Sequence, residues 1–239
     1  MHQEAQLKTQ RILAPLARQS TASIIADKLR TAISQGEISA GSQLGETELA
    51  RDLGVSRGPL REGMQRLTQE GLLIAIPNRG VFVVELTEEG VRDMYLARTA
   101  IERAAAAEIL RHDYQTAAER LFVISKRMER AAQRADNERI GVADVEFHEC
   151  LVSLANSRRL SRMHKTLLVE TRMCISALHQ TYPGPDVRVP EHRSIAEAVS
   201  AGDPQLVDQL LVAHMDDAVE RLATVVPFRS DPTRTQEQV

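Results

Sequence analysis

The chain has few of the residues that support thiol chemistry or aromatic stacking. Its 239 residues include two cysteines, no tryptophan and 3% aromatic residues. Cys150 and Cys174 lie in helical patterns and do not form the closely spaced pairs that hold metals, so we expect both to pack in a reducing compartment. The shortage of aromatic rings removes the stacking platforms that single-stranded nucleic-acid binders use.

Long apolar runs and nucleotide-binding motifs are missing as well. No run reaches the roughly 18 residues of a membrane span, and the opening MHQEAQLKTQ is polar, so we expect a cytoplasmic protein without signal peptide or membrane segment. A Walker loop, a G-x-S-x-G elbow and a dinucleotide fingerprint are all absent from the sequence. The net charge of −3 argues against unspecific binding of polyanions by the whole chain.

Residues 44–67, LGETELARDLGVSRGPLREGMQRL, predict two short amphipathic helices joined by a tight turn. The first spans about Glu46 to Leu53, and Gly54 supplies the left-handed residue that ends it. The hydroxyl of Ser56 is expected to cap the second helix. Arg57 and Arg61 then face outward, four residues apart, where their forked donors suit phosphates and guanine edges in a major groove. The pattern predicts a helix-turn-helix that reads duplex DNA.

Two β-branched apolar runs follow, at 72–76 and 81–85, separated by Pro77-Asn78-Arg79-Gly80. They predict a hairpin with a basic tip, and a hairpin after a helix-turn-helix is a wing. Arg79 beside the flexible Gly80 is placed to enter a minor groove or to touch phosphate. The alternative is a generic helix pair and hairpin whose arginines are merely solvated.

These residues resemble the GntR family of winged-helix regulators, whose pattern is L-x-E-x-x-L-A-x-x-L-G-V-S-R-x-P-x-R-E-x-x-x-x-L, then E-G-L and an R-G wing tip. The chain matches at Leu44, Glu46, Leu49, Ala50, Leu53, Gly54, Val55, Ser56, Arg57, Pro59, Arg61, Glu62 and Leu67, then at Glu70, Gly71, Leu72, Arg79 and Gly80. The resemblance implies a homodimer on an inverted-repeat operator, with DNA contacts from Thr47, Ser56, Arg57, Gly58, Arg61, Arg79 and Gly80.

Three glycines depart from the family pattern. Gly45 stands where a capping serine is frequent, Gly58 where threonine is common, and Gly63 where alanine is usual. Gly58 removes a hydroxyl that could contact phosphate. Gly63 should cost the recognition helix about 1 kcal/mol relative to alanine, which predicts a looser module.

The length indicates two domains, because a DNA-reading module needs roughly 70 residues. We predict an N-terminal arm at 1–17, a winged helix-turn-helix of three helices and a hairpin at 18–86, an all-helical bundle at 87–226 and a disordered tail at 227–239. The fold is therefore mainly α. Within the bundle, helices are expected at about 88–111, 115–135, 137–155, 158–180, 191–201 and 204–225, with a proline-broken loop at 181–190.

Asp144 and His148 lie four residues apart in the bundle and so project from one helical face. A carboxylate and an imidazole at this spacing form half of a divalent-metal site, and His192 and His214 follow in helical context. Spacing alone leaves packed or surface histidines as the alternative.

The stretch from about 90 to 226 resembles the helical FCD domain, the metal-binding branch of the FadR subfamily. The matching residues are Asp144, Phe147, His148, Asn156, Glu191, His192, Ile195 and His214. The resemblance implies that Asp144, His148, His192 and His214 bind one divalent ion per chain, and these ligands suit zinc, nickel, manganese or iron. His2, His112, His164 and His179 lack the pattern and are interpreted as solvated or packed.

The resemblance also implies a cavity for a small carboxylate effector beside the metal. Arg98 is the first candidate to neutralise the acid and Arg172 the second. For each the alternative is an ion pair with a neighbour such as Glu102 or Glu170. The predicted function is a ligand-responsive transcriptional regulator and not an enzyme. The competing hypotheses are a metal-dependent hydrolase and a regulator whose metal is structural or is itself the signal.

Overall fold

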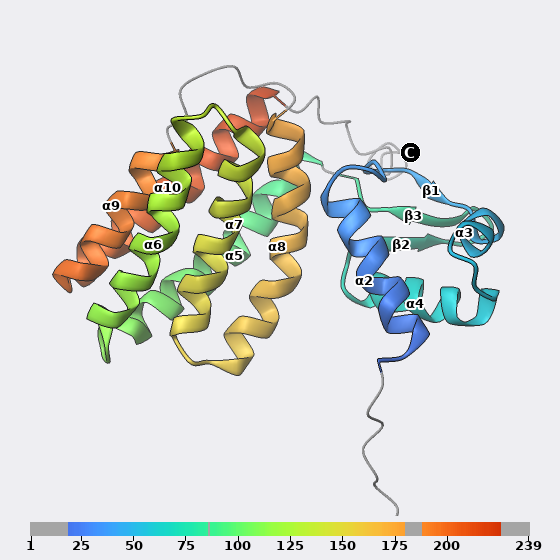
Figure 1. The fold of residues 1–239 in the computed structure, drawn as a ribbon, viewed down its shortest axis with the longest axis horizontal. Helices are drawn as coiled ribbons and strands as arrows, with labels where there is room; N and C mark the ends of the chain where they lie inside the picture. The colour runs from blue at the N-terminus through green and yellow to red at the C-terminus, as the bar shows by residue number, and fades with distance from the viewer. Residues whose placement is uncertain (1–18, 86, 180–187, 226–239) are drawn as a thin grey trace, which may run out of the picture.

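The structure, a computed structural model, describes residues 19–85, 87–179 and 188–225. The predicted arm at 1–17 and tail at 227–239 lie outside them. The amino-terminal part contains α2 (Thr21–Ser34), β1 (Gln43–Leu44), α3 (Glu46–Asp52), α4 (Arg57–Gln69), β2 (Leu73–Ile76) and β3 (Gly80–Val83). The remainder is helical: α5 (Glu88–Leu110), α6 (Tyr114–Ala132), α7 (Asn137–Leu154), α8 (Arg158–His179), α9 (Arg188–Ala201) and α10 (Pro204–Val225). Figure 1 shows the two parts side by side.

Helices α3 and α4 form the predicted helix-turn-helix. Gly54 adopts φ +63°, and the backbone N–H of Val55 donates to the carbonyl of Ala50 over 2.9 Å, which ends α3 with a left-handed residue. The predicted cap of α4 is wrong in one respect. Ser56 occupies the N-cap position with extended backbone, but its side chain accepts no capping hydrogen bond. Its exposed hydroxyl faces solvent at the start of the recognition helix.

Gly63 has a packing role that helix propensity does not capture. It is buried where α4 meets α2, and a Cβ added there would lie 3.0 Å from both the Ala22 carbonyl oxygen and the Ile25 Cγ2 atom. The glycine therefore permits a close approach of the two helices. The propensity cost relative to alanine is offset by this contact.

The wing is a hairpin within a three-stranded antiparallel sheet of order β1-β3-β2. Its tip is a tight turn in which the Arg79 N–H donates to the Ile76 carbonyl, with Pro77 followed by Asn78 at φ 61°. The observed bounds of β2 and β3 differ by one or two residues from the predicted runs at 72–76 and 81–85. Strand β1 was not predicted, because two residues are too short to show alternation.

The helices of the carboxyl-terminal part agree closely with the predicted ranges. Thr87 caps α5 by accepting from the Gly90 N–H, and Asp203 caps α10 by accepting from the Leu206 N–H. The predicted loop at 181–190 is wrong for its last residues, since α9 begins at Arg188. Pro190 lies in the first helical turn, where its missing N–H breaks no helical bond. Residues 180–187 lie outside the described structure.

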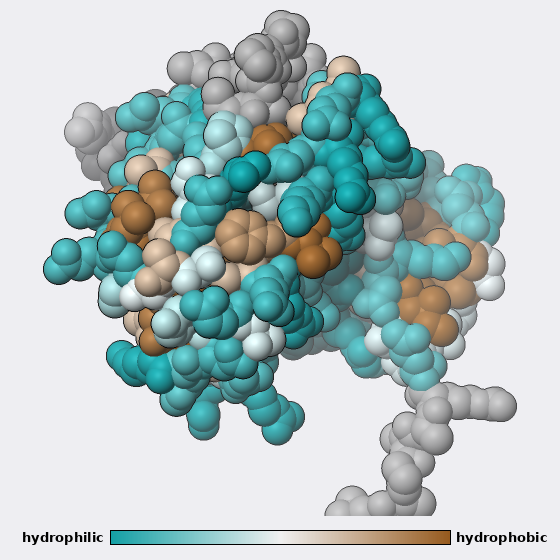
Figure 2. All heavy atoms as spheres, turned by 60° about the vertical axis from the view of Figure 1, so that its left-hand side comes forward, coloured by the Kyte–Doolittle hydropathy of each residue, from teal (hydrophilic) through white to brown (hydrophobic). Residues whose placement is uncertain are grey.

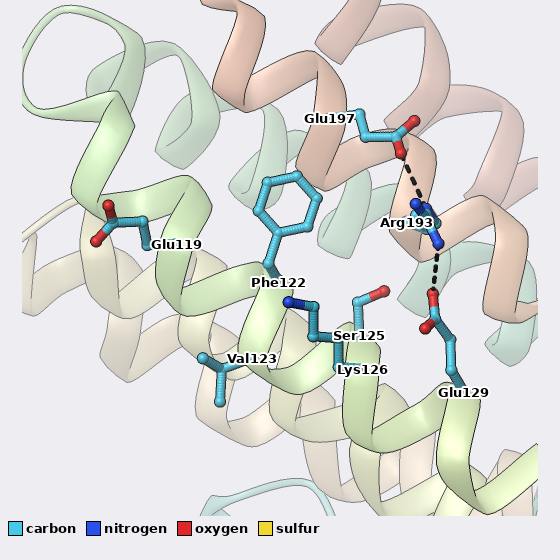
Figure 3. Close-up of a pocket in the computed structure, with 8 residues that line it drawn as sticks. All are labelled: Glu119, Phe122, Val123, Ser125, Lys126, Glu129, Arg193 and Glu197. Carbon is cyan, nitrogen blue, oxygen red and sulfur yellow. Dashed lines mark hydrogen bonds and ion pairs between the residues drawn. The ribbon is translucent and has the colours of Figure 1, made fainter.

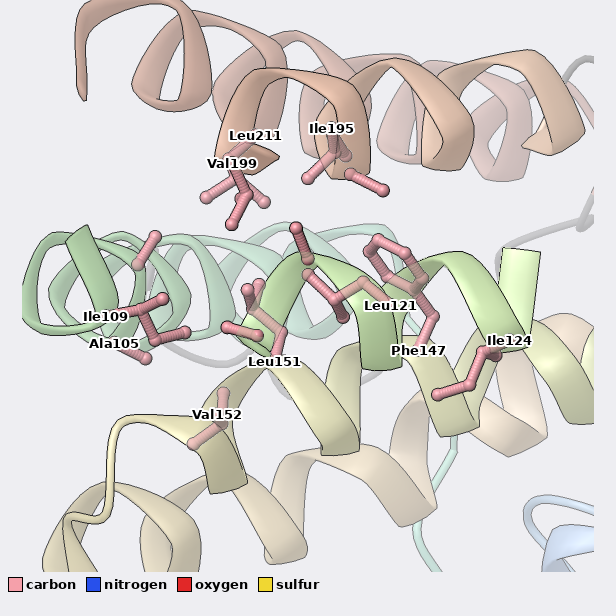
Figure 4. Close-up of a cluster of buried hydrophobic side chains, with 14 of the residues drawn as sticks. Ala105, Ile109, Leu121, Ile124, Phe147, Leu151, Val152, Ile195, Val199 and Leu211 are labelled. Atoms are coloured by element: carbon pink, nitrogen blue, oxygen red, sulfur yellow. The ribbon is translucent and has the colours of Figure 1, made fainter. Parts of the chain in front are cut away.

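One hydrophobic core joins five of these helices. Figure 4 shows its side chains meeting between α5, α6, α7, α9 and α10. Phe147, Leu151, Leu121, Ile195 and Leu211 are each completely or almost completely buried. Apolar side chains at the surface are scattered: the most exposed large ones are Leu96, Val123, Val142, Met163 and Ile74. Figure 2 shows hydrophobic groups on one face separated by hydrophilic side chains.

The amino-terminal core is completed by a helix from the other part of the chain. Val169 and Met173 of α8, exposed by 4% and 6%, belong to the same hydrophobic cluster as Leu60, Leu67 and Leu72. Helix α8 lies beside α2 in Figure 1. The two parts of the chain therefore share buried surface. Among the described helices, none is long and apolar enough to cross a membrane.

Candidate DNA interface and metal centre

The two arginines of the recognition helix are held by side chains of α3. Arg57 Nη2 donates to Thr47 Oγ1 over 3.0 Å, and Arg61 Nε donates to Glu46 Oε2 over 2.7 Å. The Arg61 side chain is still 64% exposed, and Gly58 between the arginines has no atom within 4 Å of an added Cβ. The helix start therefore presents two oriented cations and open space between them, as insertion into a groove requires.

The wing tip is fixed to β1. Gln43 Nε2 donates to the Arg79 carbonyl over 2.7 Å, and the Arg79 guanidinium lies 5.6 Å from the centre of the Phe82 ring. Gly80 has φ +108°, and a Cβ there would meet Gln43 Nε2 at 2.9 Å. The backbone conformation thus favours glycine, a side chain there would displace the Gln43 amide, and Arg79 remains exposed at the tip.

The structure brings together all four predicted metal ligands. Asp144 and His148 come from α7, His192 from α9 and His214 from α10, and their ligand atoms lie within 4.8 Å of one another. All four are at most 6% exposed. We call these residues the four-ligand cluster. His148 Nε2 lies 3.1 Å from His214 Nε2 and 3.2 Å from His192 Nε2, and His192 Nε2 lies 3.4 Å from Asp144 Oδ1.

Each imidazole uses its other nitrogen outside the cluster. Nδ1 of His148 lies 2.6 Å from Glu102, that of His214 lies 2.8 Å from Glu191, and that of His192 lies 2.7 Å from the Arg188 carbonyl. These oxygens only accept, so the N–H of each neutral ring is at Nδ1. Three Nε2 lone pairs then face one another, an arrangement that a cation stabilises. The donor set and its outer partners fit a divalent metal.

Burial and neighbouring charges hold the ligands in their metal-binding states. Burial raises the pKa of Asp144, but the adjacent histidines and Arg188 outweigh it and lower that pKa to about 2. Burial is the main cause that lowers the pKa values of His192 and His214 to about 3, against the opposing effect of Asp144. At neutral pH the carboxylate is therefore charged and these two rings are neutral, as metal ligation requires.

Glu102 connects several buried groups behind the cluster. One oxygen of its carboxylate accepts from Nδ1 of His148. The other accepts from Arg98 Nη2 at 3.1 Å and from His164 Nε2 at 2.9 Å. Burial raises the pKa of Glu102, but His148 and Arg98 bring it well below its usual value. Arg98 is 1% exposed and lies 5.0 Å from the centre of the Tyr95 ring. The alternative interpretation of Arg98, an ion pair with Glu102, is thus observed.

The structure does not bring Arg172 to the cluster. Its side chain is 42% exposed, and it forms a loose ion pair with Glu149, 3.9 Å away, rather than the expected pair with Glu170. Sequence reasoning missed the roles of Glu102 and His164. The i, i+4 spacing of Arg98 and Glu102 indicated their pairing, but no local pattern links either to His164, 62 residues beyond Glu102.

A surface groove lies between α6 and α9. Its volume is about 430 Å³, and Figure 3 shows Phe122, Ser125 and Lys126 on α6 and Arg193 on α9 among the residues that line it. Arg193 is held between Glu129 and Glu197, over 3.1 and 2.9 Å. None of the four-ligand cluster lines this groove, so it is distinct from the metal centre.

The fold and the two sites define a winged-helix DNA-binding protein with a second, all-helical domain that carries the four-ligand cluster. A family model described as the FCD domain matches residues 93–217, and one described as bacterial regulatory proteins, gntR family, matches residues 21–83. The chain belongs to the GntR family of transcriptional regulators and carries an FCD effector domain.

Characterised relatives and solved structures agree with this assignment. The chain is 29% identical over 200 residues to a probable D-xylose utilization operon transcriptional repressor of Paenarthrobacter nicotinovorans, covering 84% of this chain and 88% of that one. It is 25% identical over 212 residues to the gluconate operon transcriptional repressor of Bacillus subtilis (strain 168), covering 87% of each. A crystal structure of a putative transcriptional regulator GntR from Rhodococcus sp. RHA1 is 28% identical, with a TM-score of 0.74 over 87% of this chain and all of that one.

The predictions of fold class, family and non-enzymatic function are confirmed by these matches, because the families and relatives are transcriptional regulators. The hydrolase hypothesis is accordingly set aside. Regulators of this family bind operator DNA.

Proposed function

We propose that this regulator is a cytoplasmic repressor of the FadR subfamily, which binds an inverted-repeat operator as a homodimer and responds to a small carboxylate at a divalent metal. The observation that carries the proposal is the convergence of three Nε2 atoms and one carboxylate, each imidazole anchored through Nδ1. The metal-binding residues would be Asp144, His148, His192 and His214. Repression is suggested by the relatives named as operon repressors.

DNA reading is assigned to the recognition helix and the wing. Arg57 and Arg61 would contact base edges or phosphates, with Thr47 and Ser56 as neutral donors at the helix start. Gly58 would allow a close approach of the backbone, and Arg79 beside Gly80 would reach the minor groove or phosphate. Two such surfaces at fixed separation require a dimer.

The effector is proposed to bind at the four-ligand cluster. A bound divalent ion would supply a Lewis-acidic position for a carboxylate oxygen. Arg98 adds positive charge next to the cluster, since with burial and His148 it lowers the pKa of His214. Arg188 does the same for Asp144 and replaces Arg172 as the second candidate. The names of the relatives, which concern xylose and gluconate operons, favour an acid derived from sugar metabolism.

A second candidate is a regulator whose signal is the metal ion itself. It is favoured by the burial of all four ligands, none more than 6% exposed, which leaves little access for an organic molecule. In that case the ion would alter operator affinity without any acid.

The test is fluorescence anisotropy of the purified protein on labelled duplex DNA from the intergenic region beside its own gene, at two salt concentrations. Each titration is run with chelator, with zinc, nickel, manganese or iron, and with each metal plus a panel of sugar acids and small dicarboxylates. Operator binding that changes only with metal and acid together supports the first candidate. A change with metal alone supports the second, and an affinity equal to that for random DNA in every condition would refute the proposed operator.

A further inference from the structure

Helix α8 touches both functional parts of the molecule. Near its start, His164 is 1% exposed and contacts Glu102. Further along, Val169 and Met173 are buried in the core of the winged helix. At about 1.5 Å of rise per residue, His164 and Met173 are roughly 13 Å apart along one rigid element.

The carboxylate of Glu102 contacts both His148 of the four-ligand cluster and His164 of α8. His148 Nδ1 lies 2.6 Å from one oxygen and His164 Nε2 lies 2.9 Å from the other. The carboxylate is completely buried, so neither contact is weakened by water. A change in the position of the His148 ring therefore passes to His164 through a single planar group.

The junction between α8 and the winged helix is imperfectly packed. A cavity of about 40 Å³ lies there, lined in part by Leu72 of the winged helix, by Met94 of α5 and by Met173 of α8. Helix α5 carries both Met94 and Glu102, so it too runs from the cavity to the carboxylate. The void gives α8 room to shift against Leu72 without overlap.

We propose that Glu102 and His164 are positioning residues that couple occupancy of the four-ligand cluster to the packing of α8 against the winged helix. This inference rests on the proposed metal site. An ion bound by the cluster would fix the position of the His148 ring. Glu102, which is bonded to Nδ1 of that ring, would follow it, and His164 would carry the displacement along α8 to Val169 and Met173. The structure thus assigns α8 as the connection between sensing and DNA reading.

The experiment measures hydrogen exchange of the winged-helix amides in the full chain, with chelator and with saturating zinc, alongside zinc affinity by competition with a chromophoric chelator. The wild type is expected to show at least a threefold zinc-dependent change in exchange for amides of residues 67–73. His164→Leu should retain zinc affinity within about threefold, because His164 is not a ligand, yet lose more than half of that change. His164→Gln, which keeps a donor, should restore it.

His112→Leu is the matched control, because this histidine is 70% exposed and its side chain bonds to Glu108 at the end of α5, far along the chain from α8. It should behave as the wild type. An unchanged zinc response in His164→Leu would overturn the proposal, as would a wild type that binds zinc without any change at residues 67–73. A His164→Leu protein that no longer folds, judged by circular dichroism, is replaced by His164→Gln and His164→Asn, whose graded responses decide the same question.

Operator binding is measured in parallel, because the proposed DNA-binding function and the proposed coupling can fail independently of each other. If zinc alters exchange through His164 while no operator is bound, the proposed function is wrong and the coupling stands. If the operator is bound but zinc leaves the winged helix unchanged, the coupling is wrong and the DNA-binding function stands.

Discussion

Arg61 of the recognition helix donates its Nε–H to the carboxylate of Glu46 on the preceding helix, over 2.7 Å. Both side chains are partly exposed, at 64% and 31%. The pair therefore orients a cation that we propose to contact DNA, at a small gain in stability, since exposed ion pairs contribute about 0.2–1 kcal/mol. Glu46 also places a negative charge next to the expected path of the phosphates.

Glu46→Gln should raise affinity for random DNA by about threefold at low salt and lower discrimination in favour of the operator, because a repulsive charge and an orienting partner are lost together. Anisotropy titrations at two salt concentrations measure both quantities. Glu62→Gln, which removes a charge paired with Arg66 on the same helix, is the control. Equal effects of the two substitutions would show that orientation of Arg61 has no role.

Arg61→Ala should cost about 1–3 kcal/mol of operator binding and relax preference at one base pair, if Arg61 reads a base edge.

Arg79→Ala should weaken binding to all sequences, if Arg79 touches phosphate. It should also reduce by about one the slope of the logarithm of affinity against the logarithm of salt concentration. Affinities for operator variants at several salt concentrations separate the two roles. Zinc affinity should stay unchanged in both variants, and a loss of it would indicate misfolding.

If the four-ligand cluster binds a divalent metal as proposed, removal of that metal should lower the melting temperature. At a free ion concentration about 100 times the dissociation constant, linkage stabilises the folded chain by about 2.7 kcal/mol, or about 5–10 °C for a chain of this size. Chelator should therefore produce a drop of this order in calorimetry.

His148→Ala should abolish the chelator effect, because His148 lies at the centre of the four-ligand cluster, within 3.2 Å of two other Nε2 atoms. His112→Ala should retain it in full. A chelator effect that persists in His148→Ala would mean that the metal binds elsewhere.

Gly63→Ala should destabilise the winged helix by about 1–3 kcal/mol through overpacking, even though alanine favours helix formation by about 1 kcal/mol. The reason is the 3.0 Å approach of the added Cβ to Ala22 and Ile25. Gly58→Ala is the matched comparison in the same helix, because it meets open space. It should leave stability unchanged or raise it slightly. Denaturant unfolding monitored by circular dichroism tests both, and a stabilised Gly63→Ala protein would contradict the packing argument.

The parts of the fold that were predictable from sequence are those specified locally. Gly54 and Asp203 indicated the ends of helices because their backbone and side-chain preferences act within one turn. Strand β1 was not predictable, since its two residues form a strand only because β3 lies beside them. The start of α9 was missed because prolines at 183, 185 and 190 masked a helix that tolerates Pro190 in its first turn.

In the candidate site, too, only the features specified by local sequence were predictable. The spacing of Asp144 and His148 on α7 indicated a half-site, but only the family resemblance joined His192 and His214 to it, because helices distant in sequence have no local signal for meeting. The contact of His164 with Glu102 had neither spacing nor motif behind it. Buried polar partners of this kind become visible only when the packing of the helices is known.

Val169 and Met173 of α8 complete the hydrophobic cluster of the winged helix. The DNA-binding domain and the effector domain of this protein therefore cannot be exchanged independently for those of another regulator. A biosensor made by grafting this effector domain onto a foreign winged helix would place two apolar α8 side chains against a surface that did not evolve with them. Residues facing α8 would have to be transplanted with the sensor. A chimera that keeps Leu72 and its neighbours should stay responsive, whereas one cut at the linker alone should bind DNA and ignore its ligand.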